Sequence, residues 1–188
     1  GTAARDLYRP DSKEEIPVDD LAVDTALKDG DMVSLGNETI QAIEAKGHTD
    51  CSMAYALEPD GILFTSESTG IVEAGLAINT PILKSFADAM TSLEKCRGYG
   101  AKYICLPHFG LITQDFNEEY WMQFQQGCED RIQMVREMKK EGLDADQMLE
   151  RYRDRYWDPI MEQEQPIEAF LINAKNIIKA ALRALDEK

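Results

Sequence analysis

Short runs of alternating hydrophobic and polar residues fill the chain from residue 32 to about residue 67. They read MVSLG, TIQAIEA, SMAYALE and ILFTSE, and turn residues separate them at positions 36–37 and 59–61. Alternation with a period of two is typical of strands that bury one face, and glycine, proline and aspartate mark the turns between them. We therefore expect consecutive antiparallel strands of one sheet.

The next part of the chain predicts one helix and one further strand. A helix is expected over residues 81–97, with Pro81 in its first turn and Gly98 just past its end, because proline favours the start of a helix and glycine its end. The nearly continuous apolar run AKYICLP then predicts a buried strand that ends at Pro107-His108.

Beyond His108 the hydrophobic spacing changes to three and four residues, which is typical of amphipathic helices. The first of these helices is expected to close at Gly142, and Asp144 is a plausible N-cap for a second that runs through ADQMLERYRDRYW. Pro166 opens a third helix with a long apolar stripe. From this point we expect helices alone.

These patterns predict a single domain or half-domain of the α/β class. It consists of an irregular lead-in (residues 1–30), a sheet-and-helix core (residues 31–115) and a helical tail (residues 116–188). The order of strands, helix, strand and helices fits a mostly antiparallel sheet with helices packed on one face.

Composition limits the partners of the chain. Its 188 residues include 20 Lys and Arg against 35 Asp and Glu, for a net charge of −15. Such a surface repels phosphate backbones and anionic lipid, so we expect neither nucleic acid nor membrane as a partner. Most of the acidic side chains are interpreted as a solvated surface.

The cysteines and the hydropathy indicate the compartment. Four cysteines lie at positions 51, 96, 105 and 128, without a CxxC pair or a disulfide framework, so we predict four free thiols and a cytoplasmic location. No stretch reaches the ~18 consecutive apolar residues of a membrane span, and the first ten residues, GTAARDLYRP, have no apolar signal core.

Three side chains could form a site. His48, Glu67 and His108 each fall at or just beyond the end of a predicted strand, where loops cluster and side chains can converge. Histidine and carboxylate are suitable ligands for Zn²⁺ or iron, and a carboxylate between two histidines can bridge two metal ions. Their spacing forms no local metal motif, so two hydrogen-bonded histidines beside a solvated glutamate are the alternative.

The order of motifs around these residues resembles the second half of a metallo-β-lactamase-fold hydrolase. Gly47-His48-Thr49 is followed by a hairpin that ends in Leu63-Phe64, then by Ser66-Glu67-Ser68, and after a helix by ICLPHFG around His108. The resemblance covers roughly residues 20 to 115. It implies the carboxy-terminal half of an αββα sandwich, with a helical carboxy-terminal tail.

The resemblance also implies roles for these residues in a binuclear centre. His48 would ligate one metal, His108 the second, and Glu67 would bridge both, while Thr49 and Asp50 would orient the histidine ring. Two zinc ions are implied in the complete protein. The bridging residue of the superfamily is usually aspartate, and the additional methylene of glutamate moves the carboxylate by more than ~1 Å, so iron, manganese or a single metal are alternatives.

The principal ligand motif of the superfamily, His-x-His-x-Asp-His, is absent from this chain, which begins at Gly1 and contains two histidines in all. We therefore interpret the chain as part of a metal-dependent hydrolase in which metal-activated water attacks an ester, thioester, amide or phosphoester of a small-molecule substrate. Alone it should be inactive and should need the missing amino-terminal half or self-associate. The alternative is a non-catalytic partner or scaffold module.

Other kinds of catalytic or binding site have weaker support in the sequence. Cys105 precedes His108 by three residues, but a thiol on a buried strand is normally inert. Ser66 and Ser68 lack the G-x-S-x-G context of a nucleophile. Three aromatic residues of the tail are interpreted as core, with the wall of a substrate pocket as the alternative: Tyr152, Tyr156 and Trp157.

Overall fold

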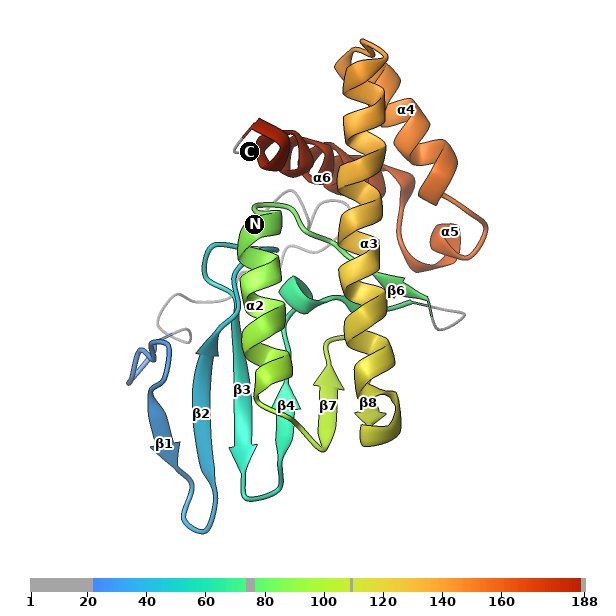
Figure 1. Cartoon of the computed structure of the whole chain (residues 1–188). Helices are drawn as coiled ribbons and strands as arrows, with labels where there is room; N and C mark the ends of the chain where they lie inside the picture. Colours follow the sequence, from blue (N-terminus) through green and yellow to red (C-terminus); the bar gives the residue numbers. More distant parts are fainter. Residues whose placement is uncertain (1–21, 74–76, 109, 187–188) are drawn as a thin grey trace.

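A computed structural model of the chain describes residues 22–73, 77–108 and 110–186 (Figure 1). Six strands form a sheet in the order β1-β2-β3-β4-β7-β8. Their bounds are β1 (Met32–Ser34), β2 (Thr39–Glu44), β3 (Met53–Glu58), β4 (Ile62–Phe64), β7 (Tyr103–Leu106) and β8 (Gly110–Thr113). Neighbouring strands are antiparallel except β4 and β7, which are parallel. The mostly antiparallel sheet is confirmed.

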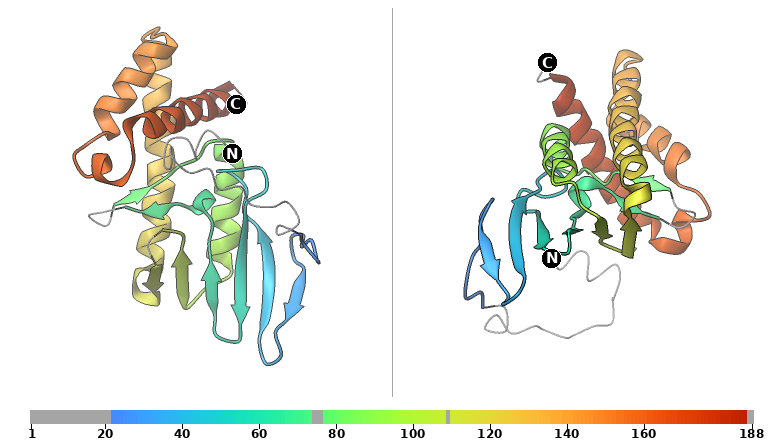
Figure 2. Two further views of the ribbon diagram at one scale, coloured as in Figure 1. Left: turned by 180° about the vertical axis from the view of Figure 1, so that it is seen from behind. Right: turned by 60° about the horizontal axis from the view of Figure 1, so that its bottom comes forward.

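Helices cover one face of this sheet, as expected. Helices α2 (Phe86–Gly98) and α3 (Gln114–Lys140) lie on the same side of the strands, as Figure 1 and its reverse view in Figure 2 show. The remaining helices are α4 (Ala145–Tyr156), α5 (Met161–Glu164) and α6 (Ile167–Asp186). Helix α6 packs against α3 and α4, and it crosses over one end of the sheet (Figure 1).

The core lies between the sheet and these helices. Alternate residues of the strands, among them Ala54, Ala56 and Leu63, are fully buried there. They meet Phe86 of α2 and Phe124 of α3 in one continuous cluster that extends into α4 and α6. Burial of alternate strand residues and of one stripe on each helix explains why these periodicities are readable in the sequence.

Helix α2 begins later than predicted. Its N-cap is Ser85, whose hydroxyl accepts a hydrogen bond from the backbone N–H of Asp88 at 3.1 Å. A serine oxygen satisfies a free N–H of the first turn, which proline cannot do, so Pro81 remains in the preceding loop. The helix also includes Gly98, and its C-cap is Tyr99.

The expectation of helices alone beyond His108 is wrong, because β8 follows that residue and pairs with β7. The short helix α5 and a second, two-stranded sheet of β5 (Ile71–Val72) and β6 (Ile78–Asn79) were also unforeseen. Strands of two residues, such as β5 and β6, contain too few positions to display a period.

The predicted start of the second tail helix is correct. Asp144 caps α4, and its carboxylate accepts from the backbone N–H groups of Asp146 and Gln147 in a capping box. All four cysteines are free thiols. Within the ranges that the structure describes, no helix is long and apolar enough to cross a membrane.

The tail aromatics belong to the core. Tyr152 is 2% exposed and packs against Tyr156 and Phe170, and Trp157 also packs against Phe170. The Tyr156 ring also lies 4.5 Å from the guanidinium of the buried Arg131. Tyr156 lines two hollows beside this arginine and Tyr152 lines one of them, but neither histidine borders those hollows.

Candidate metal centre

The three sequence-predicted site residues lie together at one end of the sheet. Strands β2, β4 and β7 run in the same direction, so their carboxyl ends meet at the edge over which α6 crosses (Figure 1). His48 follows β2, Glu67 follows β4 and His108 follows β7. The expected convergence of these side chains is therefore present.

Glu67 occupies the middle of the group. Its Oε2 lies 2.8 Å from Nε2 of His48, and its Oε1 lies 2.9 Å from Nε2 of His108. The hydrogen bond to His48 lowers the pKa of Glu67 to about 2, despite partial burial, and the contact with His108 adds to the effect. The carboxylate is thus ionised, with one oxygen directed at each imidazole.

The ring of His48 is fixed from its other side. Nδ1 lies 2.6 Å from the backbone carbonyl oxygen of Pro81, and this carbonyl, like the ionised Glu67 carboxylate at Nε2, can only accept. A neutral ring carries one hydrogen, so it turns a lone pair toward one of these two acceptors, and toward the carboxylate when Nδ1 carries the hydrogen. That contact is attractive only when a proton or another cation lies between the two groups.

The charge on His48 follows from the same contacts. Burial of the ring opposes protonation, but the hydrogen bonds to Glu67 and to the Pro81 carbonyl outweigh it, so the pKa of His48 lies above its usual value. In the chain without metal, a proton on Nε2 can therefore supply the positive charge that the geometry demands.

The ring-orienting role expected of Thr49 and Asp50 belongs instead to Pro81. Thr49 Oγ1 lies 2.6 Å from the hydroxyl of Ser52, and the Asp50 carboxylate lies 3.1 Å from Nζ of Lys84. Both contacts brace the loop rather than the imidazole. No side-chain signal could have indicated Pro81, because its contribution is a backbone carbonyl.

Gly47 explains how the His48 loop reaches its position. It adopts φ +139, and a Cβ there would lie 2.7 Å from Cβ of Ala89 on α2. Only glycine allows this approach without displacement. The Gly47 carbonyl also accepts from the backbone N–H groups of Lys84 and Ser85, which fastens the loop to the start of α2.

The two serines around Glu67 are structural. Glu67 begins a short 3-10 helix, η2 (Glu67–Thr69), whose N-cap Ser66 accepts from the N–H of Ser68. The Ser68 hydroxyl in turn accepts from the backbone N–H of His48 at 3.0 Å, which ties two site segments together. The Tyr120 hydroxyl of α3 donates to the carbonyl of Thr69 at 2.6 Å and anchors this turn to the helix.

His108 is held differently. Its side chain is 61% exposed, against 16% for His48, and its backbone adopts the left-handed region with φ +69. A non-glycine residue in this region carries a conformational cost of ~1 kcal/mol or more. Such strain is concentrated at functional sites, where the position of the side chain is maintained at the expense of a favourable backbone conformation.

The donor set suits a divalent metal in kind. Two imidazole nitrogens and a carboxylate are ordinary zinc ligands. Two donors that share a metal at ~2.0–2.1 Å stand ~2.9–3.4 Å apart, close to the observed N–O separations. The donor atoms point at one another rather than around a common centre, and no group of three or more His, Cys, Asp or Glu residues forms a ready metal site in the described part of the chain.

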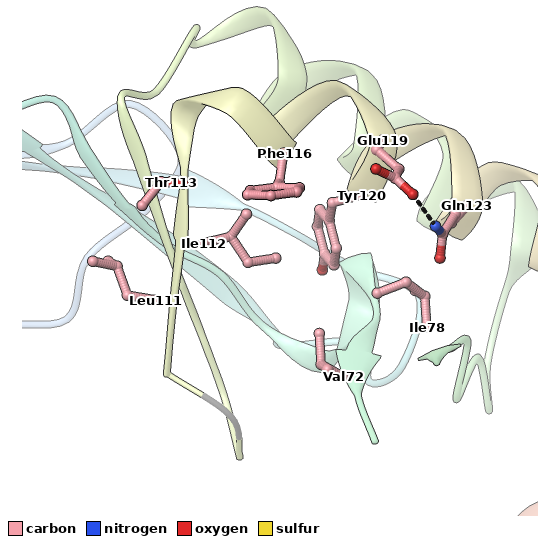
Figure 3. Close-up of a pocket in the computed structure, with 9 residues that line it drawn as sticks. All are labelled: Val72, Ile78, Leu111, Ile112, Thr113, Phe116, Glu119, Tyr120 and Gln123. Atoms are coloured by element: carbon pink, nitrogen blue, oxygen red, sulfur yellow. Dashed lines mark hydrogen bonds between the residues drawn. The ribbon is translucent and has the colours of Figure 1, made fainter. Parts of the chain in front are cut away.

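Two other candidates do not form a site. Cys105 is half-buried, and no hydrogen bond links its thiol to His108 among the described residues. An apolar hollow of about 370 Å³ lies between β8 and α3 (Figure 3). Its carboxylate, Glu119, accepts from Gln123, and no histidine or cysteine lines it.

The fold can be compared with known proteins. No family model matches the sequence. The chain is similar in structure to a metallo-beta-lactamase family protein from Thermus thermophilus, with a TM-score of 0.53 and 16% identity over 97% of this chain and 62% of that one. It is also similar to a beta-lactamase domain protein from Burkholderia ambifaria, with a TM-score of 0.58 and 18% identity over 86% and 46% of the two chains.

The chain therefore has the metallo-β-lactamase fold, and the resemblance inferred from its motifs is confirmed at the level of the fold. It spans less than two thirds of the length of either structure.

Proposed function

We propose that this chain forms part of a metal-dependent hydrolase, in which His48, Glu67 and His108 are metal ligands. One observation carries the proposal: the ionised Glu67 carboxylate faces the Nε2 atoms of both histidines, and a His48 ring that donates from Nδ1 to the Pro81 carbonyl directs its Nε2 lone pair at this carboxylate. A cation in this place would satisfy all three groups.

The chain's own residues would each have a defined task. His48 and His108 would bind through Nε2, and Glu67, which has one oxygen toward each histidine, would bridge two ions or bind one. The Nδ1–H bond to Pro81 would hold the His48 ring in its ligating tautomer. When bound, a divalent metal, with zinc, iron or manganese as candidates, would supply Lewis-acid activation of water and of an ester, thioester, amide or phosphoester substrate.

Three ligands from this chain are too few for two metals that each require four to six donors. The remaining parts of the two similar structures have no counterpart in this chain. We infer that further ligands come from a segment or partner with the other part of the fold, so this chain alone should bind metal weakly and hydrolyse nothing at an enzymatic rate.

The test is titration with Co²⁺, whose visible absorption reports the ligands and needs no catalytic activity. We expect saturable binding to the chain, and we expect His48→Gln, Glu67→Gln and His108→Gln each to weaken it by ~10-fold or more, because loss of an outer-shell partner alone typically costs ~10–100-fold in metal affinity. The control is Glu44→Gln, which removes a carboxylate at the end of β2 that pairs with Lys46 instead.

The outcomes separate the two functions that the sequence left open. If the three variants bind Co²⁺ as the unmodified chain does, the ligand assignment is wrong. The chain could also fail to bind Co²⁺ both alone and when it is combined with the other part of the fold. In that case the hydrolase proposal fails, and the chain is a non-catalytic module.

A further inference from the structure

A hollow of about 590 Å³ adjoins the candidate centre. The His48 loop and Lys84 form one wall, and α6 contributes Asn176, Lys179 and Arg183 to the other. Because these α6 residues are spaced by three and four positions, they project from the same side of the helix. The hollow therefore opens directly onto one of the proposed ligands.

The lining is basic in a strongly acidic chain. Lys84, Lys179 and Arg183 line the hollow together with a single carboxylate, Asp50, which pairs with Lys84. The chain as a whole carries a net charge of −15. A local excess of cations in a concave site attracts anions and raises their concentration there.

Two of these cations retain unused hydrogen-bonding capacity. Lys179 has no hydrogen-bond or ion-pair partner among the described residues, although the chain contains 35 acidic side chains. Arg183 donates from one terminal nitrogen to the backbone carbonyl of Lys84 at 2.6 Å. This bond holds the guanidinium across the hollow and leaves its other N–H groups for an acceptor.

We propose that this hollow binds an anionic group of the substrate, a carboxylate or a phosphate, through Lys179, Arg183 and Lys84. The assignment rests on the proposed hydrolase function and specifies its substrate class: a molecule whose anionic group sits beside His48 while the bond to be cleaved lies over Glu67. The Arg183 fork suits either anion, and Lys179 acts as a point charge.

The experiment measures anion binding to the full chain after treatment with EDTA, so that it does not depend on metal. Inorganic phosphate and succinate are titrated separately while chemical shifts are followed by NMR. We expect saturable binding of at least one probe, weakened ~5-fold or more by Lys179→Gln and further by Lys179→Glu. The tighter probe identifies the anionic group of the substrate.

The matched control is Lys102→Gln, which removes an exposed lysine near the β3–β4 turn, at the opposite end of the sheet from α6 (Figure 1). Its effect on anion affinity should stay under ~2-fold, because exposed charges more than a Debye length away are screened. Equal affinities in the unmodified chain and Lys179→Gln, or no saturable binding of either probe, would overturn the proposal.

The same variants separate this inference from the proposed function. Lys179 is not a proposed ligand, so Lys179→Gln should bind Co²⁺ as the unmodified chain does. If neither the unmodified chain nor any variant binds Co²⁺ but the unmodified chain still binds the anionic probe, the metal centre is refuted and the anion site is retained.

Discussion

Nδ1 of His48 lies 2.6 Å from the backbone carbonyl oxygen of Pro81, although the two residues belong to different loops. The bond fixes the ring, and with it the direction of Nε2 toward Glu67. A side chain positioned by a backbone atom can be disturbed only through the loop that supplies the atom, here the segment between β6 and α2.

The tautomer can be tested directly. We predict that Nδ1 of His48 keeps its hydrogen when the ring is neutral, because the Pro81 carbonyl can only accept and Nε2 is the nitrogen proposed to bind metal. Long-range ¹H–¹⁵N correlation spectra report this, and with two histidines in the chain, His108→Gln is enough to assign the signals. An unprotonated Nδ1 in the folded chain would show that the hydrogen bond is absent in solution.

The sequence indicates that the three site residues converge, but it does not indicate the hydrogen bonds that hold them in place. His48, Glu67 and His108 stand out because each follows a strand-like run, and strands that run the same way bring their ends to one edge. The bond from His48 to Pro81 and the bond from its N–H to Ser68 depend on loop geometry. Neither has a sequence period that could have indicated it.

The same distinction holds for the fold. Helices α3 and α6 have long apolar stripes and are predictable, while β5 and β6, of two residues each, are too short to show a pattern. The predicted start of α2 is too early because Pro81 and Ser85 are both plausible start signals. The His48 loop decides between them, since it packs against the start of the helix through Gly47.

Packing between α3 and the loop after β6 gives a second prediction. Gly127 lies within α3, and a Cβ there would stand 2.8 Å from Cγ2 of the buried Thr80. Gly127→Ala should therefore destabilise the chain by ~1–3 kcal/mol, although alanine is the better helix former. The free energy of unfolding from urea titration measures the effect.

Two variants check this explanation. Gly98→Ala in α2, where a Cβ would meet nothing within 4 Å, should stabilise the chain by up to ~1 kcal/mol. Thr80→Ser removes the clashing methyl group, so it should recover most of the loss in the Gly127→Ala background. A loss that persists unchanged in the double variant would mean that the contact with Thr80 is not its cause.

The buried Arg131 carries a third prediction. Its guanidinium donates to Asn79 Oδ1 at 2.8 Å, to the Gly127 carbonyl at 3.1 Å and to the Tyr152 hydroxyl at 3.2 Å. Arg131→Gln leaves several of these groups without a partner and should cost ~2–4 kcal/mol of unfolding free energy.

The control for this change lies on the same helix. Arg136 bonds the exposed Gln133, so Arg136→Gln should cost under ~0.5 kcal/mol. If the two variants lose similar amounts of unfolding free energy in urea titrations, the hydrogen bonds of the buried Arg131 add little stability beyond the cost of desolvating its guanidinium.

The final prediction concerns pH. Burial raises the pKa of Glu73 above its usual 4.5; the hydrogen bond from Asn79 and the charge of Arg131 oppose the shift, while Glu164 and Asp158 add to it. The folded chain therefore binds this proton more tightly than the unfolded chain, and stability falls as pH rises through the window that begins at 4.5.

Glu73→Gln removes the ionisation and keeps an acceptor for Asn79. It should be more stable than the unmodified chain at pH 8, with a difference that shrinks as pH approaches 4.5. Glu94→Gln, at an exposed position of α2, removes the same charge and is the control, so parallel curves for the two variants in urea titrations across this range would contradict the assignment to Glu73.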